Sequence, residues 1–214
     1  PPAARPLPIR MLAEAIGSAG LGATVIGSGI MATRLTDDVG VQLLINAVAT
    51  AAGLVVLIVV LGAVSGAHLN PVVTAALAVQ RLVPAREILP TVVAQVLGFA
   101  AGAVLANLMF GGAAVSISTT VRAEPGLLLG EVVATAGLVA VILTLVARDQ
   151  LGWVPAAVGL SIGSAYFVTS STSFANPGIT LGRMLSDSFA GIAPASAPAF
   201  IAAQLVGAAI GVLA

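Results

Sequence analysis

Six long apolar stretches follow one another along this chain, and short polar or Pro/Gly-containing segments separate most of them. A helix needs about 20 mainly apolar residues to cross the hydrocarbon core of a bilayer. Only 7% of the 214 residues are charged, whereas 59% are hydrophobic, so most of the chain must contact lipid or the interior of a membrane bundle. The pattern predicts an all-α membrane protein with six transmembrane helices, at about 11–33, 41–63, 87–109, 127–147, 153–172 and 196–214.

The chain also repeats itself in order. The segment AEAIGSAGLGA from Ala13 matches GEVVATAGLVA from Gly130, HLNPVVT matches FANPGIT, and AQVLGFAAGAVLA matches AQLVGAAIGVLA, at offsets of 117, 106 and 109 residues. Each copy contains three spans, and because three is odd, the two copies must lie upside down relative to each other. We therefore expect a single membrane domain over residues 1–214, built as an inverted 3+3 repeat with copies at about 11–109 and 127–214.

One Asn-Pro pair stands in each copy, Asn70-Pro71 within SGAHLNPVVTAAL and Asn176-Pro177 within SFANPGITLGRM. Proline suits the first position of a helix, where its missing N–H has no intrahelical partner, and asparagine just before it is a good N-cap. Each pair therefore predicts the start of a helix that is too short to span the membrane. The sequence predicts two such half-helices, at about 70–80 and 176–189.

In an inverted repeat, the two half-helices enter from opposite faces and meet near the midplane, where irregular backbone is tolerated only if it lines a cavity or is buried in protein. Their positive ends would repel cations, and each asparagine amide could donate a hydrogen bond to a passing neutral oxygen. The alternative is a buried cap without contact to the lumen, but the duplication of the motif favours a polar constriction. We call it the waist; its residues are Asn70, Pro71, Val72, Asn176, Pro177 and Gly178.

Other functional classes find less support. The chain has no cysteine and a single histidine, His68, which argues against a metal centre, and we expect no cofactor. All eight basic residues are arginine and the net charge is zero, so no basic patch exists for nucleic acid. The chain shows no nucleophile–base pair that would suggest an enzyme. The intramembrane acids Glu14 and Glu131 would be proton-relay candidates on sequence alone, which leaves an ion-coupled secondary transporter as an alternative.

Arginine is unevenly distributed between the predicted loops. Cytoplasmic loops of membrane proteins carry an excess of basic residues, and an N-terminus in the cytoplasm gives five arginines on that side against two, Arg34 and Arg122, on the other. We therefore expect a cytoplasmic N-terminus. The five arginines on its side are Arg5, Arg10, Arg81, Arg86 and Arg148.

Nearly the whole chain resembles the aquaporin/aquaglyceroporin (major intrinsic protein) family. The resemblance rests on the two Asn-Pro motifs, two Glu-x-x-x-Ser/Thr motifs that begin at Glu14 and Glu131, and AQ-x-x-G-A type segments at Gln95 and Gln204. It implies a pore in each protomer, a homotetramer, and waist asparagines that face the pore. It also implies that the two glutamates brace the half-helix loops from behind, a role that we favour over proton transport.

Three residues near the waist depart from the family pattern or invite a special role. The usual third residue of the Asn-Pro motif is alanine, whereas this chain has Val72 and Gly178, and we expect small or moderate side chains to fit at both positions. His68 stands two residues before Asn70, where the family often has histidine beside the pore. We expect a hydrogen-bonded loop histidine there rather than a titrating gate.

The largest departure follows the second motif. The family usually has arginine at this position, as the cationic member of an extracellular selectivity filter, and this chain has Ile179. The resemblance carries the other filter positions to Thr50 and Ser173 and to either Ser164 or Tyr166, of which we favour Tyr166.

Arg183 stands one helical turn after Ile179. We expect it to pair with Asp187 at i+4 rather than to replace the missing filter arginine.

A filter without a charge and with an aliphatic wall predicts a wide, amphipathic opening, since pore selectivity depends on diameter, lining donors and electrostatic barriers. We expect a passive channel for glycerol-like polyols, metalloid hydroxides such as arsenous acid, and water, which excludes ions and protons. The filter is similar to that of bacterial channels linked to arsenic operons, which implies a bacterial-type inner (plasma) membrane. A water-selective aquaporin is the alternative within the family.

Overall fold

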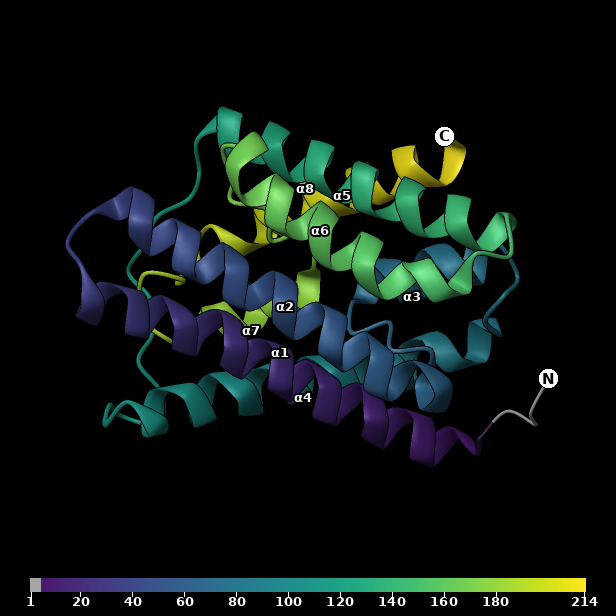
Figure 1. The fold of residues 1–214 in the computed structure, drawn as a ribbon, viewed down its shortest axis with the longest axis horizontal. Helices are drawn as coiled ribbons and strands as arrows, with labels where there is room; N and C mark the ends of the chain where they lie inside the picture. Colours follow the sequence, from purple (N-terminus) through teal and green to yellow (C-terminus); the bar gives the residue numbers. More distant parts are fainter. Residues whose placement is uncertain (1–4) are drawn as a thin grey trace.

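The computed structural model describes residues 5–214, and these residues form helices and loops without a strand (Figure 1). Two short 3-10 turns, η1 (Ala85–Glu87) and η2 (Leu151–Trp153), precede two of the helices. The helices are α1 (Leu7–Leu35), α2 (Val39–Ser65), α3 (Pro71–Val79), α4 (Ile88–Met109), α5 (Pro125–Ala147), α6 (Val154–Val168), α7 (Pro177–Arg183) and α8 (Ala197–Leu213).

The six predicted spans correspond to α1, α2, α4, α5, α6 and α8, and the two half-helices to α3 and α7. Five of the six, with α6 counted together with η2, are long and apolar enough to cross a membrane, and α8 is a shorter apolar helix of 17 residues. The all-helical fold with two half-helices is therefore confirmed.

Three boundaries differ from the prediction by four residues or more. The first span begins at Leu7 rather than at 11. The fifth span ends at Val168 rather than at 172, because Thr169 is already extended, with φ −107° and ψ 140°. The second half-helix ends at Arg183 rather than at 189. The carbonyl oxygens of Met184 and Leu185 accept hydrogen bonds from the backbone N–H groups of a distant loop, 116–118, instead of continuing the helix.

The two halves of the chain pack by the same rule. Helix α1 crosses α4 where a β-carbon added to Gly98 would lie 2.3 Å from the carbonyl oxygen of Ala15. Helix α5 crosses α8 where a β-carbon on Gly207 would lie 2.4 Å from the carbonyl oxygen of Val132. Small residues allow such close backbone approach between membrane helices, and here they occur at the two offsets of the sequence repeat, 117 and 109 residues.

The half-helices lie between the two halves and point to opposite ends of the bundle (Figure 1). Helix α3 runs toward the end where α1 begins and α8 finishes, and we call this the α3 end; α7 runs toward the other, the α7 end. The loops 80–87 and 148–153, which carry three arginines, also lie at the α3 end (Figure 1). The structure thus gathers the arginine-rich segments at one end.

The two half-helices make opposite kinds of contact with the neighbouring spans. In the first half the half-helix supplies the larger side chain, and in the second half the span does. Helix α3 packs beside α8 with Val72 in one cluster with Ala208, whereas α7 packs beside α4 with Gly178 against Phe99. A β-carbon at Gly178 would lie 2.7 Å from the ring of Phe99, which is fully buried. Val72 and Gly178 thus both fit where they stand, but the usual alanine would not fit at position 178, because Phe99 already fills that space.

Candidate functional site

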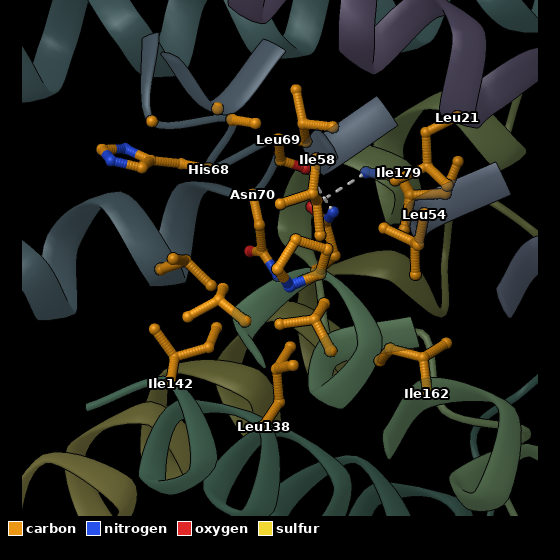
Figure 2. A pocket seen from close by; sticks show the side chains of 18 of the residues that line it. Leu21, Leu54, Ile58, His68, Leu69, Asn70, Leu138, Ile142, Ile162 and Ile179 are labelled. Carbon is orange, nitrogen blue, oxygen red and sulfur yellow. Dashed lines mark hydrogen bonds between the residues drawn. The ribbon is translucent and has the colours of Figure 1, made fainter. Parts of the chain in front are cut away.

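A cavity of about 420 Å³ extends through the middle of the bundle, on both sides of the waist. Figure 2 shows His68 and Ile179 on opposite sides of Asn70, with aliphatic side chains around them. The lining residues come from both half-helix loops, from the half-helices α3 and α7, and from α1, α2, α5 and α6, with a few from the loop after α3 and from η2. The predicted waist thus lies inside a cavity rather than in closed core.

The two walls of the cavity differ in chemistry. The half-helix side contributes Asn70, Asn176 and the loop residues 66–69 and 173–174, and therefore carries amide groups and irregular backbone. The opposite wall is aliphatic and includes Leu21, Leu54, Ile58, Leu138, Ile142 and Ile162.

The waist asparagines each make two kinds of hydrogen bond. The side-chain oxygen of Asn70 accepts from the backbone N–H of Val72 at 3.1 Å, and that of Asn176 accepts from Gly178 at 2.9 Å, so both are the N-caps that the sequence predicts. The Asn70 amide nitrogen donates to the carbonyl oxygen of Ala175 at 2.8 Å, and the Asn176 amide to that of Leu69, also at 2.8 Å.

These amide bonds tie each half of the chain to the loop of the other half. Each amide carries two N–H groups, so one on each asparagine remains for a solute in the cavity. Pro71 and Pro177 occupy the first helical positions beside them.

Glu14 lies behind the first half-helix loop and is 1% exposed. One carboxylate oxygen accepts from the backbone N–H of His68 at 2.9 Å and from the Ser65 hydroxyl at 2.7 Å. The other accepts from the N–H of Leu69 and from the amide of Gln95, both at 2.8 Å. This carboxylate therefore satisfies the donors of a loop that could not pair with itself.

Glu131 does the same behind the second loop and is fully buried. Its carboxylate accepts from the backbone N–H groups of Phe174 at 2.8 Å and Ala175 at 2.9 Å, and from the Gln204 amide at 2.6 Å. The neighbouring backbone is strained, with positive φ at Ser173 and Ala175, as at the equivalent residues of the first loop. The geometry is that of a brace that holds uncommon backbone conformations.

Two glutamines complete the braces, and no role was assigned to them from the sequence. The Gln95 amide donates to the hydroxyl of Thr74 at 3.0 Å, and the Gln204 amide to that of Thr180 at 2.9 Å. Each threonine lies in a half-helix, so each glutamine links a glutamate to the half-helix that follows its loop. The repeat of both glutamines at an offset of 109 residues was the signal in the sequence.

The residues proposed for the filter gather around the α7 end of the cavity. The hydroxyls of Thr50 and Tyr166 lie 3.1 Å apart, and both side chains line the cavity. Ser164 is exposed on the outside of α6, which agrees with our preference for Tyr166. Ile179 and Ser173 also line the cavity, and the hydroxyl of Ser173 is buried without a hydrogen-bond partner.

His68 lines the cavity on the other side of the waist (Figure 2). Its Nδ1 atom lies 3.1 Å from the hydroxyl of Thr74. The side chain thus has the hydrogen-bond partner expected of a loop histidine.

The predicted pairing of Arg183 with Asp187 is wrong. Helix α7 ends at Arg183, so the i+4 spacing no longer places the two side chains on one face, and Asp187 instead accepts hydrogen bonds from Thr119. The guanidinium of Arg183 stacks on Phe174, with its central carbon 3.3 Å from the ring centre, and its Nε donates to the carbonyl oxygen of Ala190. Arg183 lines the same cavity as Ile179.

A second arginine lies near this end of the cavity. The guanidinium carbon of Arg122, in the loop before α5, lies 5.1 Å from the ring centre of Phe174, and its Nε donates to the carbonyl oxygen of Gly191 at 2.9 Å. Burial lowers the pKa of Arg122 from its ordinary value, and the charge of Glu131 opposes this effect.

Within residues 5–214, no three His, Asp or Glu side chains gather as metal ligands.

The chain is similar to known membrane channels over almost its full length. The sequence profile of the Major intrinsic protein family matches residues 8–174. Aquaglyceroporin AqpS of Rhizobium meliloti (strain 1021) is 46% identical over 201 residues, which cover 93% of this chain and 85% of that protein. Aquaporin Z of Bradyrhizobium diazoefficiens is 33% identical over 221 residues, with 93% and 88% covered. In fold, the chain is similar to the solved aquaglyceroporin of Plasmodium falciparum, with a TM-score of 0.75, 22% identity, and 97% and 95% of the two chains covered.

Proposed function

The chain belongs to the major intrinsic protein family, and from this premise we propose that its pore admits glycerol-like polyols and metalloid hydroxides such as arsenous acid as well as water. The coarser function, a channel for water and small solutes such as glycerol, follows from the family and from the aquaglyceroporin relative. The finer proposal names the neutral solutes that pass the pore and states that ions and protons are excluded.

The observation that carries this proposal is Ile179. It is 4% exposed and lines the cavity directly after the second waist motif, where the family usually has an arginine. At this position an aliphatic side chain supplies neither a fixed charge nor donors that favour water over larger solutes. The guanidinium that does line this cavity belongs to Arg183, one helical turn further along α7. Together with the hydroxyl pair of Thr50 and Tyr166, Ile179 makes a filter with one apolar and one polar side.

The two walls of the cavity support the same solute class. A polyol or trihydroxy metalloid can place its hydroxyl groups against the amides of Asn70 and Asn176 and its less polar face against the aliphatic wall. A fully hydrated ion would lose its water against that wall, and desolvation of an unpaired charge is costly. Passive passage of neutral solutes with exclusion of ions is the function that this arrangement favours.

The assembly that we propose follows from the family resemblance, and the orientation follows from the distribution of arginine. They are a homotetramer in a bacterial-type inner membrane, with the α3 end and the N-terminus in the cytoplasm, since most of the loop arginines lie at that end. We propose no enzymatic step and no cofactor.

Stopped-flow light scattering on reconstituted vesicles tests the solute range. Water, glycerol, urea and arsenous acid are compared with protein-free vesicles, and we expect glycerol and arsenous acid permeabilities well above that background. If water alone exceeds the background, the protein is a water-selective aquaporin. Vesicles loaded with pyranine test the remaining alternative, because proton movement driven by a solute gradient would indicate an ion-coupled transporter.

A further inference from the structure

We propose that the α7 end of the cavity contains a binding site for a small planar monovalent anion of the carboxylate type, formed by Arg183 and Ser173. An anion held there would occupy the path of neutral solutes and would inhibit their flux without being carried through the waist. Since this readout rests on the proposed function, the test below also includes a measurement of binding that needs no flux.

The charge of Arg183 has no acidic partner. The side chain is 2% exposed, and no carboxylate of the described residues lies within salt-bridge distance of it. The nearest acid in the loop after α7, Asp187, is bonded to Thr119 instead. Burial of an unpaired cation is costly, so a ligand that brings a negative charge would be strongly favoured at this place.

The terminal nitrogens of Arg183 are available to such a ligand. The hydrogen bond that its guanidinium makes within the described chain uses Nε, which donates to Ala190, and one face of the group is covered by Phe174. The two terminal NH₂ groups remain, in a side chain that lines the cavity. A guanidinium binds a carboxylate through two parallel N–H···O bonds, which a single ammonium or hydroxyl cannot match.

Ser173 provides a second, independent indication of a ligand. Its side chain is 2% exposed and lines the same cavity, yet its hydroxyl has no hydrogen-bond partner. A buried hydroxyl without a partner is unfavourable. Phe174, the next residue in the chain, is the ring on which Arg183 stacks, so a ligand at this place would satisfy the hydroxyl and the guanidinium together.

The repeat shows that the fold itself does not require a cation at this place. The offset of 106 residues that relates the two Asn-Pro pairs also relates Leu77 to Arg183, and both side chains line the cavity. It relates Ala67 to Ser173 in the same way. The first half therefore builds its half-helix with apolar side chains at both positions, and the polar pair in the second half calls for another explanation.

The surroundings fit an anion rather than a second cation. The guanidinium of Arg122 lies near the ring of Phe174 and adds positive charge close to the site. The charge of Glu131 acts on both guanidiniums, but its two oxygens already accept hydrogen bonds from the loop backbone and from Gln204. Two cations therefore face one carboxylate, and the net local charge is positive.

The test measures glycerol flux into vesicles with sodium formate on both sides, at constant ionic strength set with sodium sulfate. We expect wild-type flux to fall saturably with formate. In Arg183→Leu, which copies the first half, the inhibition constant should rise about tenfold or more, which is about 1.4 kcal/mol or more. In Ser173→Ala it should rise about threefold to tenfold, since one hydroxyl bond contributes less than a paired guanidinium. Each variant is compared with its own flux without formate. Arg34→Gln is the matched control, because that arginine lies outside the cavity lining.

Binding is measured separately as the formate-dependent rise in the melting temperature of purified protein. Loss of the rise in Arg183→Leu, with the rise retained in Arg34→Gln, supports the site even if the protein carries no glycerol. If Arg183→Leu does not fold, Ser173→Ala decides. The proposal is overturned if formate changes neither flux nor melting of the wild type, or if the folded Arg183 and Ser173 variants respond to formate as the wild type does.

Discussion

The two halves of the molecule share the hydrogen bonds that support their half-helix loops but differ in several side chains that line the cavity. Each places a glutamate behind a half-helix loop, an asparagine at the helix start and a glutamine on the span that follows. At equivalent cavity-lining positions, however, the first half has Val73 and Leu77 where the second has Ile179 and Arg183. The shared glutamates and glutamines hold the backbone, the shared asparagines cap the half-helices and line the waist, and the differing positions change which side chains meet the solute elsewhere in the cavity. The comparison thus separates what the fold needs from what selectivity needs.

Removal of a brace should have the largest effect. Glu131→Ala leaves two backbone N–H groups and the Gln204 amide without their acceptor, which should cost about 3 kcal/mol or more of folding free energy. Glu14→Ala should cost a similar amount if the braces are equivalent. Yield of monodisperse protein and melting temperature measure this, and normal yield with abolished glycerol flux would instead indicate a direct role in transport.

Gly178→Ala should destabilise the contact between α7 and α4, in which the half-helix supplies the smaller side chain. Its methyl group would meet the ring of Phe99, and overpacking of this kind costs about 1–3 kcal/mol. The double variant with Phe99→Leu should recover part of the loss, because the ring is what fills the space. Melting temperatures of the two single variants and the double variant test this coupling, and strict additivity would show that the two residues do not compete.

Substitution of a waist asparagine should affect both halves alike. Asn70→Asp and Asn176→Asp each replace an amide that donates across the waist with a carboxylate that cannot, so a bond to the opposite loop is lost. We expect roughly tenfold lower glycerol flux, about 1.4 kcal/mol, and weaker exclusion of cations. Flux and proton leak are measured at equal protein content, and unchanged values for both would exclude the asparagines from the pore function.

Ile179→Arg should produce the smallest and most selective change. The added side chain narrows the filter and offers donors to water, so the ratio of glycerol to water permeability should fall about fivefold, the equivalent of one hydrogen bond of about 1 kcal/mol. Val73→Arg, at the equivalent position of the first half, is the matched comparison. A folded Ile179→Arg protein with an unchanged ratio would mean that position 179 does not select.

Much of this arrangement could be predicted because local rules agree with the repeat. An Asn-Pro pair favours a helix start, and its duplication located the waist. The bracing role of the two glutamates and the choice of Tyr166 over Ser164 came from the family resemblance, because the residues alone do not assign these positions.

What could not be predicted depends on contacts between distant segments. Helix α7 is short because the loop at 116–118 takes the carbonyl oxygens that would continue it. Arg183 misses Asp187 for the same reason, since the helix ends before the i+4 partner is reached. The lack of space at Gly178 reflects the ring of Phe99, nearly eighty residues earlier in the chain.

The crossed amide bonds of the waist also constrain how the chain is made. The first half contains its own brace, because Glu14, its loop and Gln95 all precede residue 96 in the chain. The Asn70 amide, however, needs the carbonyl oxygen of Ala175, and the Asn176 amide needs that of Leu69. During synthesis, the first half can therefore form its braced loop by itself. The Asn70 amide, however, stays unpaired until the second half has been inserted into the membrane. Assembly of the two halves is a late, joint step, and neither half can reach its finished state alone.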